Sequence, residues 1–262
     1  MNQPAIRFDN GEAYERYMGK WSQLVAAAFL DWLKPANGLR LLDVGCGNGA
    51  FTEMFATRCA PASISGIDPS PMLEFARTRP ALRGADLRQG DAMALPFADN
   101  SFDLAVMPLV LFFVPEPIRG VAEMARVVKP GGIVSAYSWD MEGGGFPYAV
   151  MRAELEQMGV RAPSAPSEEA SRQDVSRRLW ESAGLVDVET RAITVQRTYA
   201  GFDEYWAIQL AFPSVGSILK DLPASESAAL QQRLRQRFPV DAQGKLTYSS
   251  TANAIHGRVP AR

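Results

Sequence analysis

Three glycines at alternate positions follow a short apolar segment early in the chain. The run reads Asp43-Val44-Gly45-Cys46-Gly47-Asn48-Gly49. Glycine permits positive φ and lets a ligand touch the backbone with no Cβ in the way. Where a helix follows such a turn, its free N–H groups point at the same place. The run therefore predicts a nucleotide-type binding turn at the carboxyl end of a strand.

The glycine turn alone leaves more than one interpretation open. Gly45, Gly47 and Ala50 also match the dinucleotide fingerprint, so a nicotinamide-dependent oxidoreductase is an alternative. Glycine-rich turns after strands also occur for purely structural reasons. The oxidoreductase hypothesis further requires a proton donor, such as a tyrosine and a lysine at helical spacing. No Tyr-x-x-x-Lys is present in the sequence.

Two carboxylates at the ends of later strands narrow the choice. Asp68 follows the apolar segment at residues 64–67, where a carboxylate can accept hydrogen bonds from both ribose hydroxyls of an adenosine. Asp91 closes a further segment at residues 86–89 and suits the amino group of adenine. The order and spacing of these acids, with a Lys-Pro-Gly-Gly turn at 129–132, favour an adenosine ligand.

Strands and helices that can position these residues alternate along the chain. Apolar runs predict strands at 39–44, 64–67, 86–89, 102–107, 133–138, 186–195 and 246–259, and periodicity predicts helices at 13–33, 50–58, 117–128 and 171–183. A further helix opens after Ser70, which can cap it, with Pro71 at its first position. Residues 202–238 carry helical patterns interrupted at Pro213 and Pro223.

This order predicts a doubly wound α/β fold with a seven-stranded, mostly parallel sheet. We expect a single domain over residues 1–262. Within it, residues 10–35 form an N-terminal helical cap and residues 38–200 the cofactor-binding core. Residues 201–240 form a helical lid, and residues 241–262 the final strand.

Composition excludes several classes of protein. The formal net charge of −2 argues against nucleic acid as the main partner. There is no 18-residue apolar run and no apolar signal core, so neither a membrane span nor secretion is expected. Two cysteines, Cys46 and Cys59, and one histidine make no disulfide framework or metal cluster, and a reducing cytoplasm is the simplest location.

Residues 40–139 resemble the class I S-adenosylmethionine-dependent methyltransferases, near the branch that includes the ubiquinone and menaquinone C-methyltransferases. The resemblance rests on three runs, 43–49, 67–72 and 90–97. It implies the Rossmann-like methyltransferase fold and S-adenosylmethionine as cofactor, with S-adenosylhomocysteine as product. It implies that the following residues border the cofactor: Asp43, Gly45, Cys46, Gly47, Asn48, Gly49, Asp68 at the ribose, Pro69, Met72 on adenine, Asp91, Ala92, Met93 and Leu109. Tyr14, Tyr17, Met18 and Trp21 resemble the family's closing helix.

Methyl transfer requires acceptor, methyl carbon and sulfur in line, and a base only if the acceptor must lose a proton. The acceptor is expected to be a small molecule in an apolar pocket under the lid. Candidates for that pocket are Trp139, Phe146, Tyr148, Tyr205, Trp206 and Phe212.

No catalytic base is evident in the sequence. Family members often have a polar residue or a histidine after the fourth strand, where this chain has Phe112 and Phe113. The remaining candidates are Asp140, Glu142 and His256, each of which has an ordinary structural interpretation as well. A module that binds S-adenosylmethionine without catalysis is a further alternative. The acceptor atom and the oligomeric state are not encoded in any motif.

Overall fold

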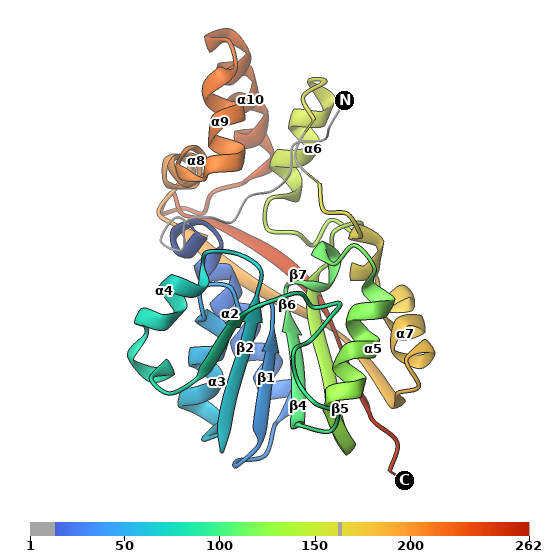
Figure 1. Cartoon of the computed structure of the whole chain (residues 1–262). Coiled ribbons are helices and arrows are strands. Elements are labelled where there is room, and N and C mark those ends of the chain that lie inside the picture. The colour runs from blue at the N-terminus through green and yellow to red at the C-terminus, as the bar shows by residue number, and fades with distance from the viewer. Residues whose placement is uncertain (1–13, 162–163, 262) are drawn as a thin grey trace.

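One seven-stranded sheet organises the chain, in the order β3-β2-β1-β4-β5-β7-β6 (Figure 1). The computed structural model describes residues 14–161 and 164–261. Strands β1 to β5 are parallel, and β7 runs antiparallel to both of its neighbours. The predicted doubly wound α/β fold is therefore confirmed. The strands are β1 (Arg40–Val44), β2 (Ser63–Asp68), β3 (Asp86–Gln89), β4 (Phe102–Pro108), β5 (Val128–Trp139), β6 (Val186–Tyr199) and β7 (Leu246–Arg258).

Helices cover both faces of the sheet, which explains why the central strands are apolar throughout. Successive side chains of a strand point to opposite faces. Leu41 accordingly packs with Phe29 and Phe55 on one face, while Leu42 packs with Val121 and Trp180 on the other. The covering helices are α2 (Lys20–Leu33) and α3 (Ala50–Cys59) on the first face, and α5 (Pro117–Val127) and α7 (Gln173–Ser182) on the second (Figure 1).

Several element boundaries differ from those expected. The predicted helix at 13–33 is divided into a π-helical turn, η1 (Glu15–Gly19), and α2. Such π turns are concentrated at functional sites. Helix α4 (Leu73–Thr78) begins later than Pro71, after a turn. Strand β6 continues beyond residue 195 because it pairs with β7 as far as Tyr199, opposite Leu246.

Three consecutive helices lie between β6 and β7: α8 (Phe202–Ala211), α9 (Pro213–Asp221) and α10 (Ala224–Arg237). The expected breaks occur where proline was noted, at the first turn of α9 and directly before α10. With α6 (Ala149–Gln157), these helices lie beyond the carboxyl ends of the parallel strands (Figure 1). Glu154 of α6 is 3% exposed and forms ion pairs with Arg233 and Arg237, which fasten α6 to α10.

Short 3-10 helices complete the chain: η2 (Pro80–Leu82), η3 (Leu111–Phe113) and η4 (Glu168–Ser171). Within residues 14–161 and 164–261, no helix is long and apolar enough to cross a membrane. The same residues contain no group of histidine, cysteine and acidic side chains that could hold a metal ion.

Candidate active site

A cavity of about 200 Å³ lies at the carboxyl ends of β1, β2 and β4. The chain order reverses between β1 and β4, and ligands of open α/β sheets bind at such a switch point. Its walls come from the glycine turn, the ends of three strands, η3 and one face of α2. The lining residues are Tyr14, Ser22, Gln23, Ala26, Asp43, Gly45, Cys46, Gly47, Asn48, Ala50, Phe51, Asp68, Pro69, Ser70, Met72, Pro108, Leu109, Val110, Phe113 and Tyr137.

The glycine turn borders the cavity in a backbone conformation that side chains disfavour. Gly45 has φ +80°, and a Cβ there would lie 2.4 Å from a methyl carbon of Val110. Gly47 has φ +50°, and its Cβ would lie 3.0 Å from Cε of Met72 and 3.8 Å from Oδ2 of Asp68. The missing Cβ at Gly47 therefore leaves open the space between the Met72 thioether and the Asp68 carboxylate.

Asp68 ends β2 and is held in place by the neighbouring backbone. Its Oδ2 accepts the N–H of Gly47 at 2.8 Å, and its Oδ1 accepts the N–H of Ser70 at 2.8 Å. The Ser70 hydroxyl also donates to Oδ1, at 2.5 Å. A carboxylate oxygen has two lone-pair sites, so Oδ2 can still accept a hydrogen bond from a ligand hydroxyl.

Asp43 is fully buried in the cavity wall, and one of its two carboxylate oxygens has no partner among the described residues. Oδ2 accepts the hydroxyl of Thr52 at 2.6 Å, whereas Oδ1 has no hydrogen-bond partner among the described residues. Burial, reinforced by the charge of Asp68, raises the pKa of Asp43 to about 7. A buried carboxylate oxygen without a partner is costly, and a cationic ligand group would satisfy it.

The neighbouring thiol is not a nucleophile. Burial, with the charges of Asp43 and Asp68, raises the pKa of Cys46 far above its usual range. Cys46 is thus a neutral side chain at neutral pH, since the reactive form of cysteine is the thiolate.

Leu109 forms part of the opposite wall in a strained conformation. Its φ is +60°, which is uncommon for any residue other than glycine, and its N–H donates to the carbonyl of Tyr137 at 2.7 Å. Strain of this kind is concentrated at functional sites. The pairing of Pro108 with Tyr137 brings the ends of β4 and β5 together beside the glycine turn.

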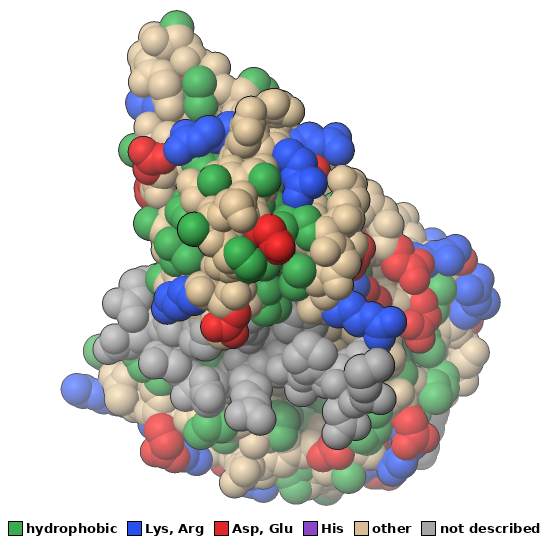
Figure 2. Space-filling model, turned by 90° about the horizontal axis from the view of Figure 1, so that it is seen from above, with side chains coloured by type: hydrophobic (Ala, Val, Ile, Leu, Met, Phe, Trp, Pro, Cys, Tyr) green, Lys and Arg blue, Asp and Glu red, His purple; other side chains and the backbone are tan. Residues whose placement is uncertain are grey.

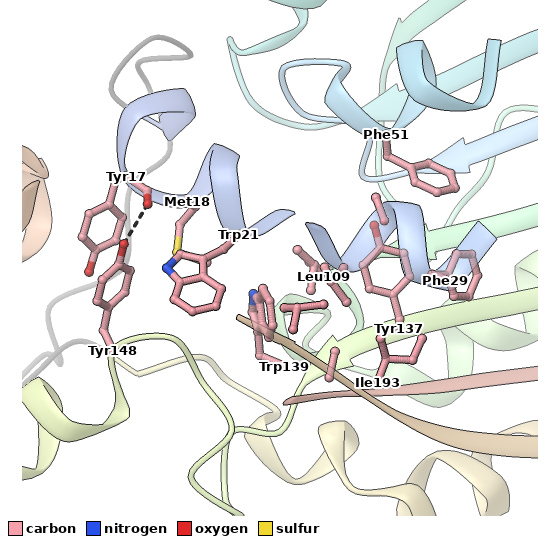
Figure 3. Packing of buried hydrophobic residues seen from close by; sticks show 14 of the residues in the cluster. Tyr17, Met18, Trp21, Phe29, Phe51, Leu109, Tyr137, Trp139, Tyr148 and Ile193 are labelled. Atoms are coloured by element: carbon pink, nitrogen blue, oxygen red, sulfur yellow. Dashed lines mark hydrogen bonds between the residues drawn. The ribbon is translucent and has the colours of Figure 1, made fainter. Parts of the chain in front are cut away.

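Of the described residues that precede α2, Tyr14 alone reaches the cavity. Tyr14 lines the cavity, and its hydroxyl lies 3.2 Å from that of Ser22. Tyr17, Met18 and Trp21 are instead buried in the aromatic core beside it, as Figure 3 shows. Tyr17 and Trp21 were expected at the cofactor. Neither side chain lines the cavity.

The adenine-bordering residues expected after β3 do not line this cavity. Asp91, Ala92 and Met93 form a turn in which Asp91 Oδ1 accepts the N–H of Met93 at 2.8 Å. The cavity ends at Pro69, Ser70 and Met72, on the β2 side of that turn.

The expected acceptor-pocket aromatics form a packed cluster next to the cavity. Tyr17 is stacked between Tyr148 and Phe212, with ring centroids 4.1 Å and 3.8 Å away. The hydroxyl of Tyr148 donates to the Tyr17 carbonyl at 2.7 Å (Figure 3). None of the residues expected in this pocket lines the described cavity, because their side chains fill the core instead. Those residues are Trp139, Phe146, Tyr148, Tyr205, Trp206 and Phe212.

The three catalytic candidates also lie outside the cavity lining. Asp140 accepts the N–H of Gly143 in the loop after β5, and exposed Glu142 pairs with Arg172. His256 is opposite Ser135 of β5, and its ring centroid lies 4.9 Å from that of Trp32. Burial lowers the pKa of His256.

Sequence reasoning missed about half of the cavity wall. Ser22, Gln23 and Ala26 line the cavity from one face of α2. Their helical spacing could have predicted that they share a face. Tyr137 could be placed only through the register of β4 and β5. The other missed lining residues are Ala50, Phe51, Ser70, Pro108, Val110 and Phe113.

Known proteins similar to this chain agree on one family. Residues 42–136 match the methyltransferase domain family. The chain is 31% identical over 190 residues to demethylmenaquinone methyltransferase of Staphylococcus aureus, covering 64% of this chain and 77% of that protein.

Solved structures share the fold at lower identity. Haemonchus contortus phosphoethanolamine N-methyltransferase 2, solved with phosphomonomethylethanolamine and S-adenosylhomocysteine, gives a TM-score of 0.59 at 18% identity over 95% of this chain and 57% of that one. The cyclase SpnF gives a TM-score of 0.55 at 22% identity, and the match covers 92% of this chain and 82% of that one. Because a cyclase shares the fold, the fold alone does not define the reaction.

The sequence relative and the matching domain decide between the hypotheses, and neither the oxidoreductase nor the non-catalytic module is favoured. The chain belongs to the class I S-adenosylmethionine-dependent methyltransferases, near the quinone C-methyltransferase branch, and is an enzyme that transfers a methyl group from that cofactor.

Proposed function

We propose that the cavity at the carboxyl ends of β1, β2 and β4 holds S-adenosylmethionine, whose methyl group passes to a small-molecule acceptor. The observation that carries the proposal is Asp43 Oδ1, which is buried in the cavity wall without a partner among the described residues. The ammonium group on the amino acid part of the cofactor would supply the missing donor and a compensating charge.

The other end of the cavity suits the adenosine part. Asp68 Oδ2 retains acceptor capacity for a ribose hydroxyl, and the thioether of Met72 offers a polarizable surface to the adenine ring. The space beside Gly47, between these two side chains, would receive the nucleoside. The following residues complete the proposed cofactor seat: Gly45, Cys46, Asn48, Gly49, Pro69, Leu109 and Tyr14, with Asp91, Ala92 and Met93 along the outer edge of adenine.

The bound cofactor supplies a methyl group already activated on a sulfonium. The chain's own residues then have two tasks. Asp43 and Asp68 fix the amino acid part and the ribose of the cofactor, which orients it. Leu109, Phe113 and Tyr137 form apolar walls that exclude water, which strengthens every electrostatic interaction inside the site.

The aromatic cluster beside the cavity is the proposed acceptor side. Tyr148 and Phe212 enclose Tyr17 there, and Tyr205 packs beside Tyr148. The buried hydroxyl of Tyr205 has no hydrogen-bond partner in the described part of the chain. An acceptor with a ring and an oxygen substituent would match both features. The name of the Staphylococcus aureus relative, a demethylmenaquinone methyltransferase, supports an acceptor of that type. Trp139, Phe146 and Trp206, which belong to or pack against the same cluster, would border this acceptor side.

The surface of the helical region is compatible with a small acceptor. On the face that Figure 2 shows, Lys and Arg side chains alternate with Asp and Glu rather than gathering into a broad basic area. Extended nucleic-acid binding requires a basic stripe.

Titration calorimetry and thermal shift with S-adenosylmethionine, S-adenosylhomocysteine and a nicotinamide dinucleotide test the cofactor. Both adenosyl ligands are expected to bind, with about 2.7 kcal/mol of stabilisation at 100 times the dissociation constant. Binding of the dinucleotide alone would overturn the proposal. Methyl transfer from labelled cofactor to a panel of quinols, phenols and small amines then tests the acceptor class, and incorporation only into protein or RNA would overturn the small-molecule part.

A further inference from the structure

A polar cluster behind the glycine turn connects the N-terminal segment to the cofactor seat. Arg79, at the end of α4, is at its centre. Its Nη2 lies 3.0 Å from Oε2 of Glu15, and its Nη1 lies 2.5 Å from Oε2 of Glu53. Its Nε donates to the carbonyl of Asn48 at 2.6 Å. One guanidinium therefore joins η1, α3 and the glycine turn.

Glu15 is bound twice within this cluster. Besides the contact with Arg79, its Oε2 accepts the side-chain amide of Asn48 at 2.6 Å. Asn48 is 3% exposed and lines the cavity, and its own Oδ1 accepts the N–H of Ala50. A displacement of Glu15 would thus leave a buried amide and a largely buried guanidinium with fewer partners, which opposes the displacement.

Glu15 connects this cluster to the part of the N-terminal segment that lines the cavity. Glu15 directly follows Tyr14, the one residue before α2 that lines the cavity within the described residues. The next contacts along the segment are those of Tyr17, whose ring is stacked between Tyr148 and Phe212 and whose carbonyl accepts the Tyr148 hydroxyl at 2.7 Å. Residues 14–21 are therefore held at Glu15, at Tyr17 and at Trp21, whose Nε1 donates to the Tyr199 hydroxyl at 3.2 Å. Of these three contacts, only that of Glu15 touches the glycine turn.

We propose that Glu15, bound to Arg79 and Asn48, is a positioning residue that holds residues 14–21 closed over the cofactor and sets the rate at which the cofactor exchanges. The proposal rests on the cavity being the cofactor seat. Glu15 acts through Tyr14 and the glycine turn. Because the contact is an ion pair whose glutamate side chain is 32% exposed, salt weakens it and accelerates exchange.

Glu53 provides a matched control within the same cluster. Its side chain is also 32% exposed and pairs with the same guanidinium, at a shorter distance. It belongs to α3, however, and does not reach the N-terminal segment. A loss of charge around Arg79 is therefore common to Glu15→Ala and Glu53→Ala, whereas the release of residues 14–21 belongs to Glu15→Ala alone.

The test follows labelled S-adenosylhomocysteine by rapid mixing and by chase with unlabelled ligand, in the full chain. For Glu15→Ala, release is expected to be about tenfold faster, the scale of one lost charged hydrogen bond, and association faster as well. A residue that merely supports the fold would not speed association. Release from the wild type should quicken as salt rises, and this response should disappear in Glu15→Ala.

Glu53→Ala should change both rates less than about twofold, since it leaves residues 14–21 attached. Release from Glu15→Ala within twofold of wild type, or an equal effect of Glu53→Ala, would overturn the proposal while leaving the cofactor seat intact. Failure of the wild-type chain to bind the ligand at all would overturn both.

Discussion

The backbone N–H of Gly47 donates to Oδ2 of Asp68 at 2.8 Å, so the glycine turn and the end of β2 are held together before any ligand binds. The contact follows from the sheet, because β1 and β2 are parallel neighbours with Val44 opposite Ile67. The turn after β1 and the acid after β2 therefore emerge side by side. Pre-organisation of this kind lowers the cost of ordering the site on binding.

Replacing Asp68 tests the ribose assignment. Asp68→Ala removes the acceptor and is expected to weaken cofactor binding by roughly 1–3 kcal/mol, because a buried diol would lose its partner. Calorimetric titration with S-adenosylhomocysteine measures the change. Asp86→Ala, which removes an exposed acid paired with Arg88 one strand away, should leave the affinity unchanged. Equal affinity in Asp68→Ala and wild type would contradict the assignment.

Replacing Gly47 tests the open space beside it. Gly47→Ala places a Cβ 3.0 Å from Met72 Cε, and affinity for S-adenosylhomocysteine is expected to fall at least tenfold. Gly38→Ala is the matched control, since Gly38 has φ +76° and no atom within 4 Å of the added carbon. Both variants lose stability because alanine disfavours the left-handed backbone, by about 1–2 kcal/mol. Only Gly47→Ala should lose affinity, and a parallel loss in both would show that strain alone is responsible.

The strands and the cofactor turn were accessible from sequence because each is specified locally. A few neighbouring residues are enough to predict the apolar strands β1, β2 and β4. The same holds for the turn that contains the glycines at positions 45, 47 and 49. The order β1-β4-β5 and the position of β7 between β5 and β6 follow from the pairing of distant segments.

The acceptor side was harder to predict, because the sequence does not show whether an aromatic side chain points into a cavity or into the core. Tyr148 and Phe212 were singled out, but their rings enclose Tyr17 rather than the cavity. Glu15 and Arg79 carried no motif, and their contact joins residues 64 positions apart. Long-range polar contacts of this type require the fold before they can be predicted.

Replacing His256 tests the one imidazole of the chain as a catalytic base. His256 packs on Trp32 and faces Glu189 at 3.7 Å, outside the cavity lining. The turnover of His256→Gln is measured with an acceptor identified for the wild type. It is expected to stay within about twofold of wild type, with an unchanged pH profile, because the ring touches no part of the proposed site. Loss of the acidic-side ionisation from the profile in His256→Gln would instead show that His256 is a catalytic group.

Asp43 makes cofactor binding depend on pH in a defined direction. Burial raises the pKa of Asp43 to about 7 in the unliganded protein. The ammonium group of the cofactor would favour the carboxylate and lower that pKa, so binding below pH 7 must release a proton. Affinity for S-adenosylhomocysteine is therefore expected to rise by up to tenfold per pH unit as the pH approaches 7, and to level off above it.

The same acid predicts an opposite trend for stability without ligand. Because the folded pKa of Asp43 lies above the unfolded one, the folded chain keeps a proton that the unfolded chain releases between about pH 4 and 7. The contribution of Asp43 to the unfolding free energy therefore falls as the pH rises through that window.

Asp43→Asn should remove both pH trends, that of cofactor affinity and that of stability. It should also stabilise the unliganded protein near pH 7 and weaken cofactor binding. Calorimetry in buffers of different ionisation enthalpy counts the released proton, and no proton release in the wild type at pH 6 would contradict the assignment of Asp43 to the ammonium group.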